Sequence, residues 1–254
     1  MSDASGSSLT RMLAILDHFS LERFEWTVED LSEATGYTVS STYRYVRALG
    51  KAGLLNRLPG GTYVIGAKII ELETLTRRVD PVATAARPLL RDLARQTGCA
   101  CLLSSVYAER LINVAYEPGV DAVDVRYTRG EPLPWFRGAP GTAVLSFMDI
   151  ARVRRLFDRF EAHASHDAGE AWRLWRNRLK AVRAAGFCVS RGELQPDLVG
   201  FGAAVQPQDD DPIGSISLVC TRQRADLLDA QGIGELLVAK AKELGAQIAS
   251  HGKR

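Results

Sequence analysis

The chain has 254 residues, of which 46% are hydrophobic and 24% charged, as in a globular protein of one large or two ordinary domains. A formal net charge of only +2 excludes global charge as the source of any nucleic-acid affinity, which would require a local basic patch. No run of 18 uncharged apolar residues occurs, which excludes a membrane-spanning helix.

The N-terminus and the cysteines indicate the compartment. Residues 1–8, MSDASGSS, contain an acid and no apolar run, unlike a secretory signal, and we expect them to form a disordered tail. Cys99, Cys101, Cys188 and Cys220 form no CxxC pair and lie in apolar, strand-like segments, which is typical of reduced, buried cysteines. We therefore expect a cytoplasmic protein that has no membrane partner.

The first part of the chain has the pattern of three short helices. Apolar residues at helical spacing predict a first helix over 9–19. Thr27 can cap the free amides of a second helix, and Gly36 suits the left-handed end of that helix. Thr38 or Ser40 can cap a third helix. A helix, a glycine turn and a second helix are the pattern of a helix-turn-helix.

Two short strands follow these helices. They are predicted over 54–57 and 62–65, and the pair Gly60 and Gly61 supplies the positive φ that a tight hairpin needs. With this hairpin as a wing, residues 9–65 are predicted to form a winged helix-turn-helix.

The charges of this region are separated along the chain. Between positions 38 and 70 there are five Lys and Arg residues and no acid, whereas residues 22–33 contain five acids and a single Arg. A segment with one acidic and one basic side is suited to face a polyanion in one orientation. The alternative is a helical scaffold that docks a protein partner and keeps its basic face solvated.

The third helix is expected to enter the major groove of double-stranded DNA with its first turns. Arg44 near the helix start could read a guanine, whereas Arg47 and Lys51 suit contacts with phosphates. The predicted DNA-binding residues are Thr38, Ser40, Ser41, Thr42, Tyr43, Arg44, Arg47, Lys51 and, at the wing, Arg57.

A boundary is predicted at Asp80-Pro81. Residues 66–79 again have apolar positions at helical spacing, and Pro81 stops this helix because proline lacks an amide and restricts the preceding residue. We therefore expect a linker helix over 66–80 and a second domain over 81–254.

The second domain mixes strands and helices. A helix over 82–97 opens it, with Pro88 as a kink or a late start. Strands are predicted over 99–106, 111–116, 123–127, 198–205 and 213–219, and helices over 142–148, 149–161, 167–185 and 236–248. Antiparallel strands with helices on one face predict an α+β fold.

Several motifs in this order resemble the IclR family of bacterial transcriptional regulators. They are LTRMLAILDHF, WTVEDLSEATGYTVSSTYRYVRALGKAGLL and GGTYVIGAKIIEL, followed by RGAPGTAVLSF, GFCVSRGEL, LVGFGAAV and GSISLV. The resemblance extends over residues 9–250. It implies a winged helix-turn-helix joined by a linker helix to a GAF-like (profilin-like) effector-binding domain. It also implies an operator in double-stranded DNA, dimers that often pair into tetramers, and a small organic acid or aromatic compound as the signal.

The resemblance also implies an effector pocket. Its residues, carried over where the motifs match, are Val125, Leu133, Ala139, Pro140, Gly200 and Ser217. Two positions depart from the family. Val219 stands where the family often has a hydroxyl or small residue, and Gly200 stands where some members have a polar or sulfur-containing side chain. Both changes remove hydrogen-bond partners, so we expect an apolar pocket.

Three neighbouring residues bear on the choice of effector. Trp135 and Phe136 would add aromatic surface, and Arg137 could bind a carboxylate with two parallel hydrogen bonds. This favours an aromatic acid or a related catabolic aromatic, with a small aliphatic keto or hydroxy acid as the alternative. In the other interpretation, Trp135 and Phe136 are packing residues and Arg137 points to solvent.

No motif indicates an enzyme. The chain lacks GxSxG, GxxxxGK[ST] and HExxH sequences, and we expect no catalytic residue, metal site or cofactor. An enzyme that uses the pocket, or an adaptor that binds only proteins, is a less favoured alternative. The sequence leaves repressor and activator equally open.

Overall fold

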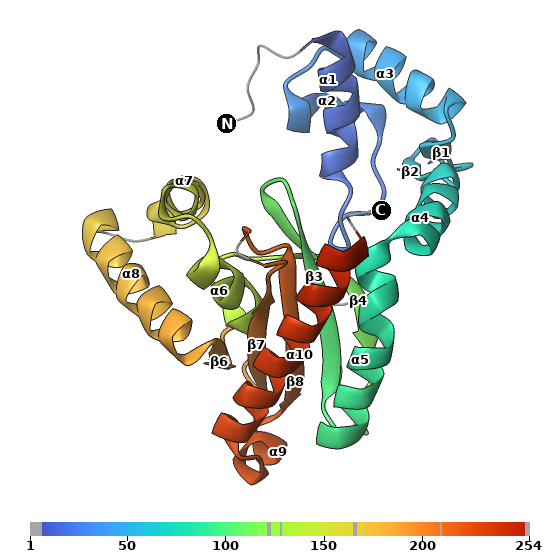
Figure 1. Ribbon diagram of the computed structural model, residues 1–254. Coiled ribbons are helices and arrows are strands. Elements are labelled where there is room, and N and C mark those ends of the chain that lie inside the picture. Colours follow the sequence, from blue (N-terminus) through green and yellow to red (C-terminus); the bar gives the residue numbers. More distant parts are fainter. Residues whose placement is uncertain (1–6, 121–122, 128, 165–166, 209, 252–254) are drawn as a thin grey trace. The chain divides into compact units, whose positions relative to one another are not determined.

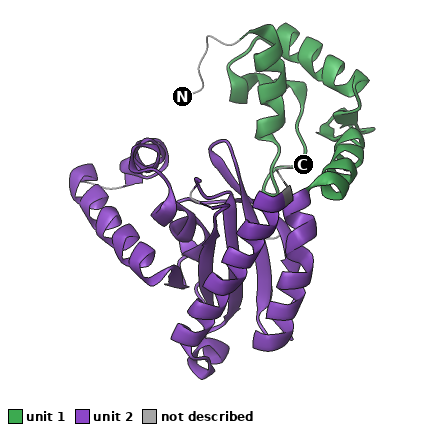
Figure 2. Ribbon diagram, in the orientation of Figure 1, with its two compact units in different colours: residues 1–80 green, residues 81–254 purple. Residues whose placement is uncertain are grey.

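Figure 1 shows the computed structural model, which describes residues 7–120, 123–127, 129–164, 167–208 and 210–251. Most of the tail predicted over 1–8 lies outside these residues. The chain divides into two compact units, residues 1–80 and 81–254 (Figure 2).

Unit 1 contains a helix-turn-helix and a two-stranded hairpin. Its elements are α1 (Ser8–Ala14), the 3-10 turn η1 (Ile15–His18), α2 (Val28–Thr35), α3 (Val39–Lys51), β1 (Leu55–Arg57), β2 (Tyr63–Ile65) and α4 (Lys68–Val79). Trp26 and Tyr63 exchange backbone hydrogen bonds at 3.1 and 2.7 Å, which attaches the segment before α2 to the wing.

The predicted helix ends around the turn are confirmed. The hydroxyl of Thr27 accepts from the amide of Asp30 at 3.1 Å, and Gly36 ends α2 in the left-handed region with φ 71°. Of the two candidate caps for α3, the structure uses Thr38, whose hydroxyl accepts from the amide of Ser41 at 3.3 Å. Side-chain caps thus determine where both helices begin.

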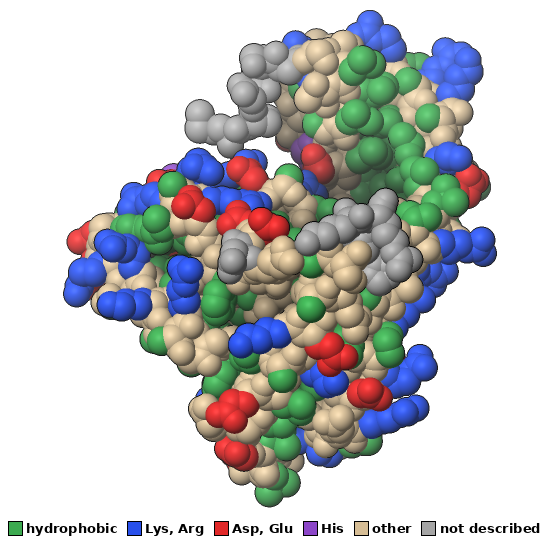
Figure 3. All heavy atoms as spheres, viewed as in Figure 1, with side chains coloured by type: hydrophobic (Ala, Val, Ile, Leu, Met, Phe, Trp, Pro, Cys, Tyr) green, Lys and Arg blue, Asp and Glu red, His purple; other side chains and the backbone are tan. Residues whose placement is uncertain are grey.

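Two helices of unit 1 leave apolar residues exposed. The helix predicted over 9–19 is interrupted, because α1 ends at Ala14 and continues as the tighter η1. Ile15 is fully buried, whereas Leu9 is 68% exposed, contrary to the predicted core-facing stripe. In α4 no residue is buried, and Ile70 and Val79 are 69% and 74% exposed. Figure 3 shows hydrophobic side chains across the surface of this unit.

Unit 2 is an antiparallel six-stranded sheet with the order β5-β4-β3-β8-β7-β6. Its elements are α5 (Pro81–Thr97), β3 (Ala100–Tyr107), β4 (Arg110–Glu117), β5 (Pro132–Leu133), α6 (Gly138–Phe147), α7 (Ile150–Phe160), the 3-10 turn η2 (Ala162–Ala164), α8 (Ala168–Ala185), β6 (Phe187–Arg191), β7 (Leu198–Val205), β8 (Gly214–Thr221), α9 (Arg222–Leu227) and α10 (Ala230–His251). Helix α5 continues through Pro88 without a break.

Helices cover both faces of the sheet, which corrects the prediction of helices on one face. Helices α5 and α10 cover one face of the sheet, where Leu93 and Leu244 are buried in one cluster with Phe201 and Leu218. Phe201 of β7 and Leu218 of β8 are paired across the two strands. Helix α6 packs on the opposite face (Figure 1). This close packing requires Gly202, because a Cβ there would lie 2.8 Å from the carbonyl oxygen of Ala139.

The strand predicted over 123–127 does not form; these residues are described and have no ladder partner. Residues 130–133 occupy the edge of β4 instead. The amide of Gly130 donates to the carbonyl of Asn113 at 2.8 Å, and the amide of Asn113 donates to Glu131 at 3.3 Å. The prediction was wrong because hydrophobic alternation does not specify which segment wins a sheet edge.

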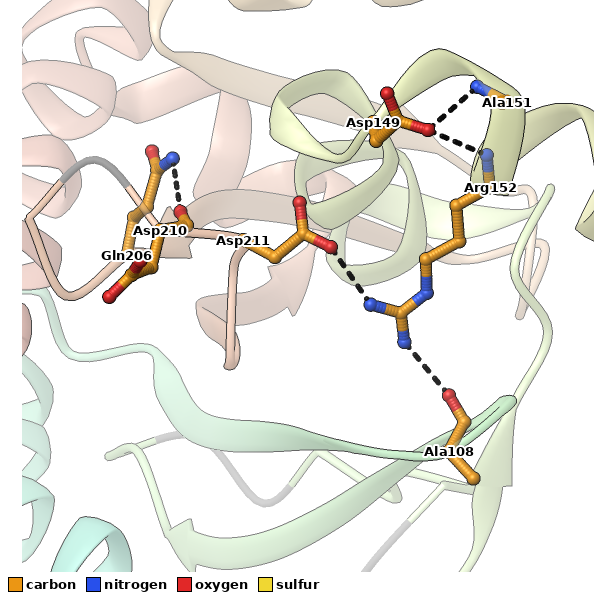
Figure 4. A network of polar contacts seen from close by, with 7 residues as sticks. All are labelled: Ala108, Asp149, Ala151, Arg152, Gln206, Asp210 and Asp211. Atoms are coloured by element: carbon orange, nitrogen blue, oxygen red, sulfur yellow. Dashed lines mark hydrogen bonds and ion pairs between the residues drawn. The ribbon is translucent and has the colours of Figure 1, made fainter.

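Arg152 holds the start of α7 against two turns of the sheet (Figure 4). Its guanidinium donates to the carboxylate of Asp211 and to the carbonyl of Ala108, both at 3.0 Å. Asp149 caps the same helix, accepting from the amides of Ala151 and Arg152 at 3.0 and 3.1 Å. The position of α7 is therefore set by polar contacts as well as by its apolar face.

The packing of α6 predicts a difference between two glycines of β7. Gly202→Ala should destabilise the protein by about 1–3 kcal/mol, because the backbone of α6 must move. Gly200→Ala is the matched control, since its nearest neighbour would be the Cβ of Ala139 at an ordinary 3.6 Å. Urea unfolding of both variants measures the difference, and equal stabilities would contradict the packing argument.

Candidate functional site

The exposed face of α3 gathers most of the predicted DNA-binding residues. Thr38, Ser40, Tyr43, Arg44, Arg47 and Lys51 are exposed there, Ser41 is half-buried, and Arg57 is exposed on the hairpin. In Figure 3, Lys and Arg side chains project over this helix. A hollow between the start of α3 and the hairpin is lined by Val39, Ser40, Tyr43, Arg57 and Gly61. The face is therefore continuous from the helix to the wing.

Thr42 has to be removed from the predicted set. Its side chain is fully buried, and its hydroxyl donates to the carbonyl of Thr38 at 3.1 Å. The position follows from helical spacing, because Thr42 shares the inner face of α3 with Tyr45, Val46 and Leu49.

Charge separation in unit 1 leaves the α3 cations available. On the acidic side, Arg23 pairs with Asp30 at 2.6 Å and lies 3.6 Å from the centre of the Trp26 ring. The hydrogen bond from Thr27, together with Arg23, lowers the pKa of Asp30. By contrast, among the described contacts the cations Arg44, Arg47, Lys51 and Arg57 make no ion pair.

Unit 2 contains a cavity of about 50 Å³ between the sheet, the start of α6 and two loops. Seven of the predicted effector residues line it: Val125, Leu133, Ala139, Pro140, Gly200, Ser217 and Val219. Because α6 begins at Gly138, Ala139 and Pro140 lie in its first turn, whereas the sequence predicted them in a loop. Proline suits this place, where the missing amide has no partner to lose.

The cavity wall contains an unpartnered hydroxyl. Ser217 is fully buried, and its Oγ makes no hydrogen bond with the described residues. Asn113, on the same wall, is satisfied: its amide oxygen accepts from Ser104 at 2.7 Å, and its nitrogen donates to the carbonyl of Tyr127 at 2.6 Å. A buried hydroxyl without a partner costs about 1–3 kcal/mol, which a bound molecule can recover.

Glu193 is a cavity residue that the sequence reasoning missed. One carboxylate oxygen accepts from the amide of Gly138 at 2.8 Å, and the other accepts from the guanidinium of Arg178 at 2.6 Å. Since Arg137, the residue before α6, provides no side-chain cap, Glu193 satisfies the first amide of that helix. The motif GEL, in the loop before the strand predicted over 198–205, was the available signal, because polar residues in such a loop can turn toward the sheet.

Gln195 was also missed, and it connects two loops over the cavity. Its side-chain nitrogen donates to the carbonyl of Asp124 at 2.9 Å, and its oxygen accepts from the amide of Arg126 at 2.8 Å. This side chain thus takes the place of a neighbouring strand for residues 123–127.

Trp135, Phe136 and Arg137 lie outside the cavity lining. Trp135 is buried and donates from its indole nitrogen to the carbonyl of Glu109 at 2.8 Å. Phe136 is buried in a separate cluster, with its ring centre 5.1 Å from that of Trp175. These two are packing residues, as in the second interpretation of the sequence.

Arg137 is exposed and lines an outer hollow with Glu161. Burial raises the pKa of Glu161, and the positive charge of Arg137 opposes that shift. Arg137 is therefore not placed to bind a carboxylate in the cavity.

All four cysteines are buried, and no disulfide joins them. Burial raises the pKa of the thiols of Cys101 and Cys188, which disfavours the reactive thiolate.

Among the described residues, no group of three or more His, Cys, Asp or Glu could hold a metal ion. No described helix is long and apolar enough to cross a membrane.

A helix-turn-helix in one unit and a cavity beside the sheet of the other are the features of ligand-responsive transcriptional regulators. The chain belongs to the IclR family. Residues 74–246 match the family described as "Bacterial transcriptional regulator IclR C-terminal", and residues 8–59 match "IclR helix-turn-helix domain". The protein is therefore a DNA-binding transcriptional regulator with a ligand-binding C-terminal domain.

Three proteins that resemble this chain share 24% sequence identity with it or less. The chain is 24% identical over 200 residues to the HTH-type transcriptional regulator KipR of Bacillus subtilis (strain 168), covering 78% of this chain and 79% of that one. An IclR family regulator from Brucella abortus has the same fold, with TM-score 0.80, 18% identity and coverage of 96% and 94%. An IclR homologue from Microbacterium hydrocarbonoxydans, solved with 4-hydroxybenzoate, has TM-score 0.77, 16% identity and coverage of 96% and 100%.

The position of Gln195 predicts that Gln195→Ala loosens residues 123–127. The amide of Arg126 loses its acceptor, so its hydrogen exchange should become faster. Exchange followed by mass spectrometry on the peptide that contains Arg126 measures the change. Gln206→Ala is the control, because Gln206 bonds within its own hairpin, to the carbonyl of Asp210 at 2.6 Å. Unchanged exchange in Gln195→Ala would contradict the predicted role.

Proposed function

We propose that a small aromatic compound, a class that includes aromatic acids, binds in the unit 2 cavity and changes the affinity of this regulator for its operator. The observation that carries the proposal is the fully buried, unpartnered hydroxyl of Ser217 in a wall formed mainly by apolar residues. A molecule with a flat apolar body and one polar group would cover that wall and supply the missing hydrogen bond.

The walls favour an aromatic body over a small aliphatic acid. Val125, Leu133 and Val219 present hydrocarbon, and Gly200 presents no side chain. A two- or three-carbon keto acid would leave this surface in contact with water. The relative solved with 4-hydroxybenzoate supports the class, although at 16% identity it shows only the fold.

Ligand entry requires the cavity to widen. A cavity of about 50 Å³ holds only a few water molecules. This volume is smaller than the volume of an aromatic ring. The segment 123–127 is the part of the wall held by the side chain of Gln195, and its displacement would enlarge the site. A ligand that binds the widened form more tightly shifts the population toward that form.

For transmission we propose that residues 9–65 act as the DNA-binding domain, 66–80 as the linker and 81–254 as the effector domain. In α4 the apolar residues Ile70, Leu75 and Val79 are all more than half exposed, and in α1 Leu9 and Leu13 are also exposed. Such surfaces suit contact with a second copy of the chain, so we propose a homodimer that can pair into a tetramer. The spacing of two DNA-binding domains would then follow the state of the effector domains.

A fluorescence-anisotropy titration of the full chain on DNA from upstream of its own gene tests this function. We expect operator binding in low salt, and a change in affinity when a panel of benzoates, phenols and benzamides is added. Pyruvate and glyoxylate serve as the aliphatic controls. DNA binding that responds only to the aliphatic acids would refute the aromatic class, and an absence of DNA binding would refute the regulator.

Two substitutions in α3 should have different effects on operator binding. Lys51→Ala, at the end of the helix, should weaken binding to all sequences similarly and reduce the salt slope by about one, because one phosphate contact is lost. Arg44→Ala, near the helix start, should cost about 1–3 kcal/mol and relax the preference at one base pair. Binding to operators with single base changes, at several salt concentrations, measures both effects. A uniform loss in Arg44→Ala would refute base reading by that residue.

A further inference from the structure

We propose that Glu193 makes the effector cavity selective for a neutral ligand whose polar group donates a hydrogen bond, and that it disfavours a ligand carboxylate at the start of α6. This inference rests on the proposed function, because it assumes that an aromatic compound binds in the cavity. It concerns a loop residue whose role follows only from its contacts.

The start of α6 is the natural place for an anion in this cavity. Helix N-termini present unpaired amides and a partial positive charge, and the guanidinium of Arg178 lies at the same place. A ligand carboxylate would normally be expected here. The carboxylate of Glu193 already occupies the position, with one oxygen on the amide of Gly138 and the other on Arg178.

The ion pair of Glu193 and Arg178 is partly shielded from water. Their side chains are 28% and 34% exposed, so the charges are neither fully solvated nor fully buried. Arg178 is further held by the face of Trp175, with its guanidinium carbon 4.9 Å from the ring centre. The positive charge is therefore already balanced, and an additional anion in the cavity would face the negative charge of Glu193.

The remaining polar groups of the cavity can also accept hydrogen bonds. Glu193 has lone pairs beyond those used by Gly138 and Arg178, and the hydroxyl of Ser217 is unpartnered. Asn113 keeps one amide N–H, because the other donates to the carbonyl of Tyr127. A phenolic hydroxyl, an alcohol or a primary amide on the ligand is complementary to this arrangement, whereas a carboxylate brings only acceptors and a second negative charge.

Benzamide and benzoate form a matched pair of probes, since they have the same shape and differ in charge and in hydrogen-bond donors. In a ligand-observed NMR titration of the full-length protein, we expect wild type to bind benzamide about tenfold or more tightly than benzoate. Glu193→Gln should reduce or reverse this ratio, because the glutamine amide removes the negative charge and offers a donor to the carboxylate. Its oxygen still accepts from Gly138, and thermal unfolding will confirm that the variant is folded.

Glu161→Gln is the control variant, because Glu161 lies in the outer hollow and does not line the cavity. It should leave the benzamide-to-benzoate ratio unchanged. If benzoate binds wild type as tightly as benzamide, or more tightly, the inference is overturned: the ligand carboxylate then displaces Glu193 from Gly138 and Arg178. A ratio that is the same in wild type and in Glu193→Gln also overturns it.

These outcomes are separable from failure of the proposed function. A preference for benzoate, with operator binding that responds to it, would overturn the role of Glu193 and leave the aromatic regulator intact. Binding of neither probe, with no response of operator affinity to other aromatic compounds, would overturn the proposed ligand class, and the selectivity assigned to Glu193 would fall with it.

Discussion

The contact between α6 and the sheet at Gly202 is the constraint on which unit 2 depends. Because a side chain at this position would collide with the backbone of Ala139, the helix can lie directly on β7 only above a glycine. The first turn of α6 consequently reaches the loop after β6. There its free amide, at Gly138, is within hydrogen-bond distance of Glu193. One close backbone approach thus defines both the wall of the cavity and its charge.

The polar groups around the cavity differ in how well they are satisfied. Asn113 is hydrogen-bonded through both ends of its amide, and Glu193 is hydrogen-bonded through both carboxylate oxygens. Ser217 has no partner. Ser105 and Ser215 are also buried and unpartnered, but they lie outside the cavity lining, and we have no physical account of them. Of these three, only Ser217 can gain a hydrogen bond when a ligand enters the cavity.

Unit 1 exposes cationic side chains on α3 and the wing, and apolar side chains on α1 and α4. The cations of α3 and the wing make no described ion pair, so their charge remains available to phosphates. The exposed apolar residues of α1 and α4 gain nothing from contact with water. A helix of 12 residues with no buried side chain is marginal by itself, and a second copy of the chain would supply the missing packing. The proposed DNA contacts and the proposed self-association would therefore use separate parts of the same small unit.

Features that depend on neighbouring residues could be predicted from the sequence, whereas competition between distant segments could not. The caps at Thr27 and Gly36 depend on backbone groups within a few residues, and both are where the pattern placed them. Thr42 was misassigned because hydroxyl chemistry was considered without the helical face on which the residue lies. The segment 123–127 was predicted as a strand, yet the sheet edge went to residues 130–133, an outcome that depends on how two distant segments compete for β4.

The sequence by itself determined the family resemblance, the two-part organisation, the helix caps and most of the cavity residues, because each depends on short motifs or on alternation within one element. Only the tertiary structure decided which polar groups meet. Trp135 and Phe136 pack in a hydrophobic cluster outside the cavity lining, Arg137 faces an outer hollow, and Glu193 rather than Arg137 lines the cavity. The physical reason is that a hydrogen bond or ion pair requires atoms to lie about 3 Å apart. Residues far apart in the sequence, such as Gly138 and Glu193, acquire that proximity only when the chain folds.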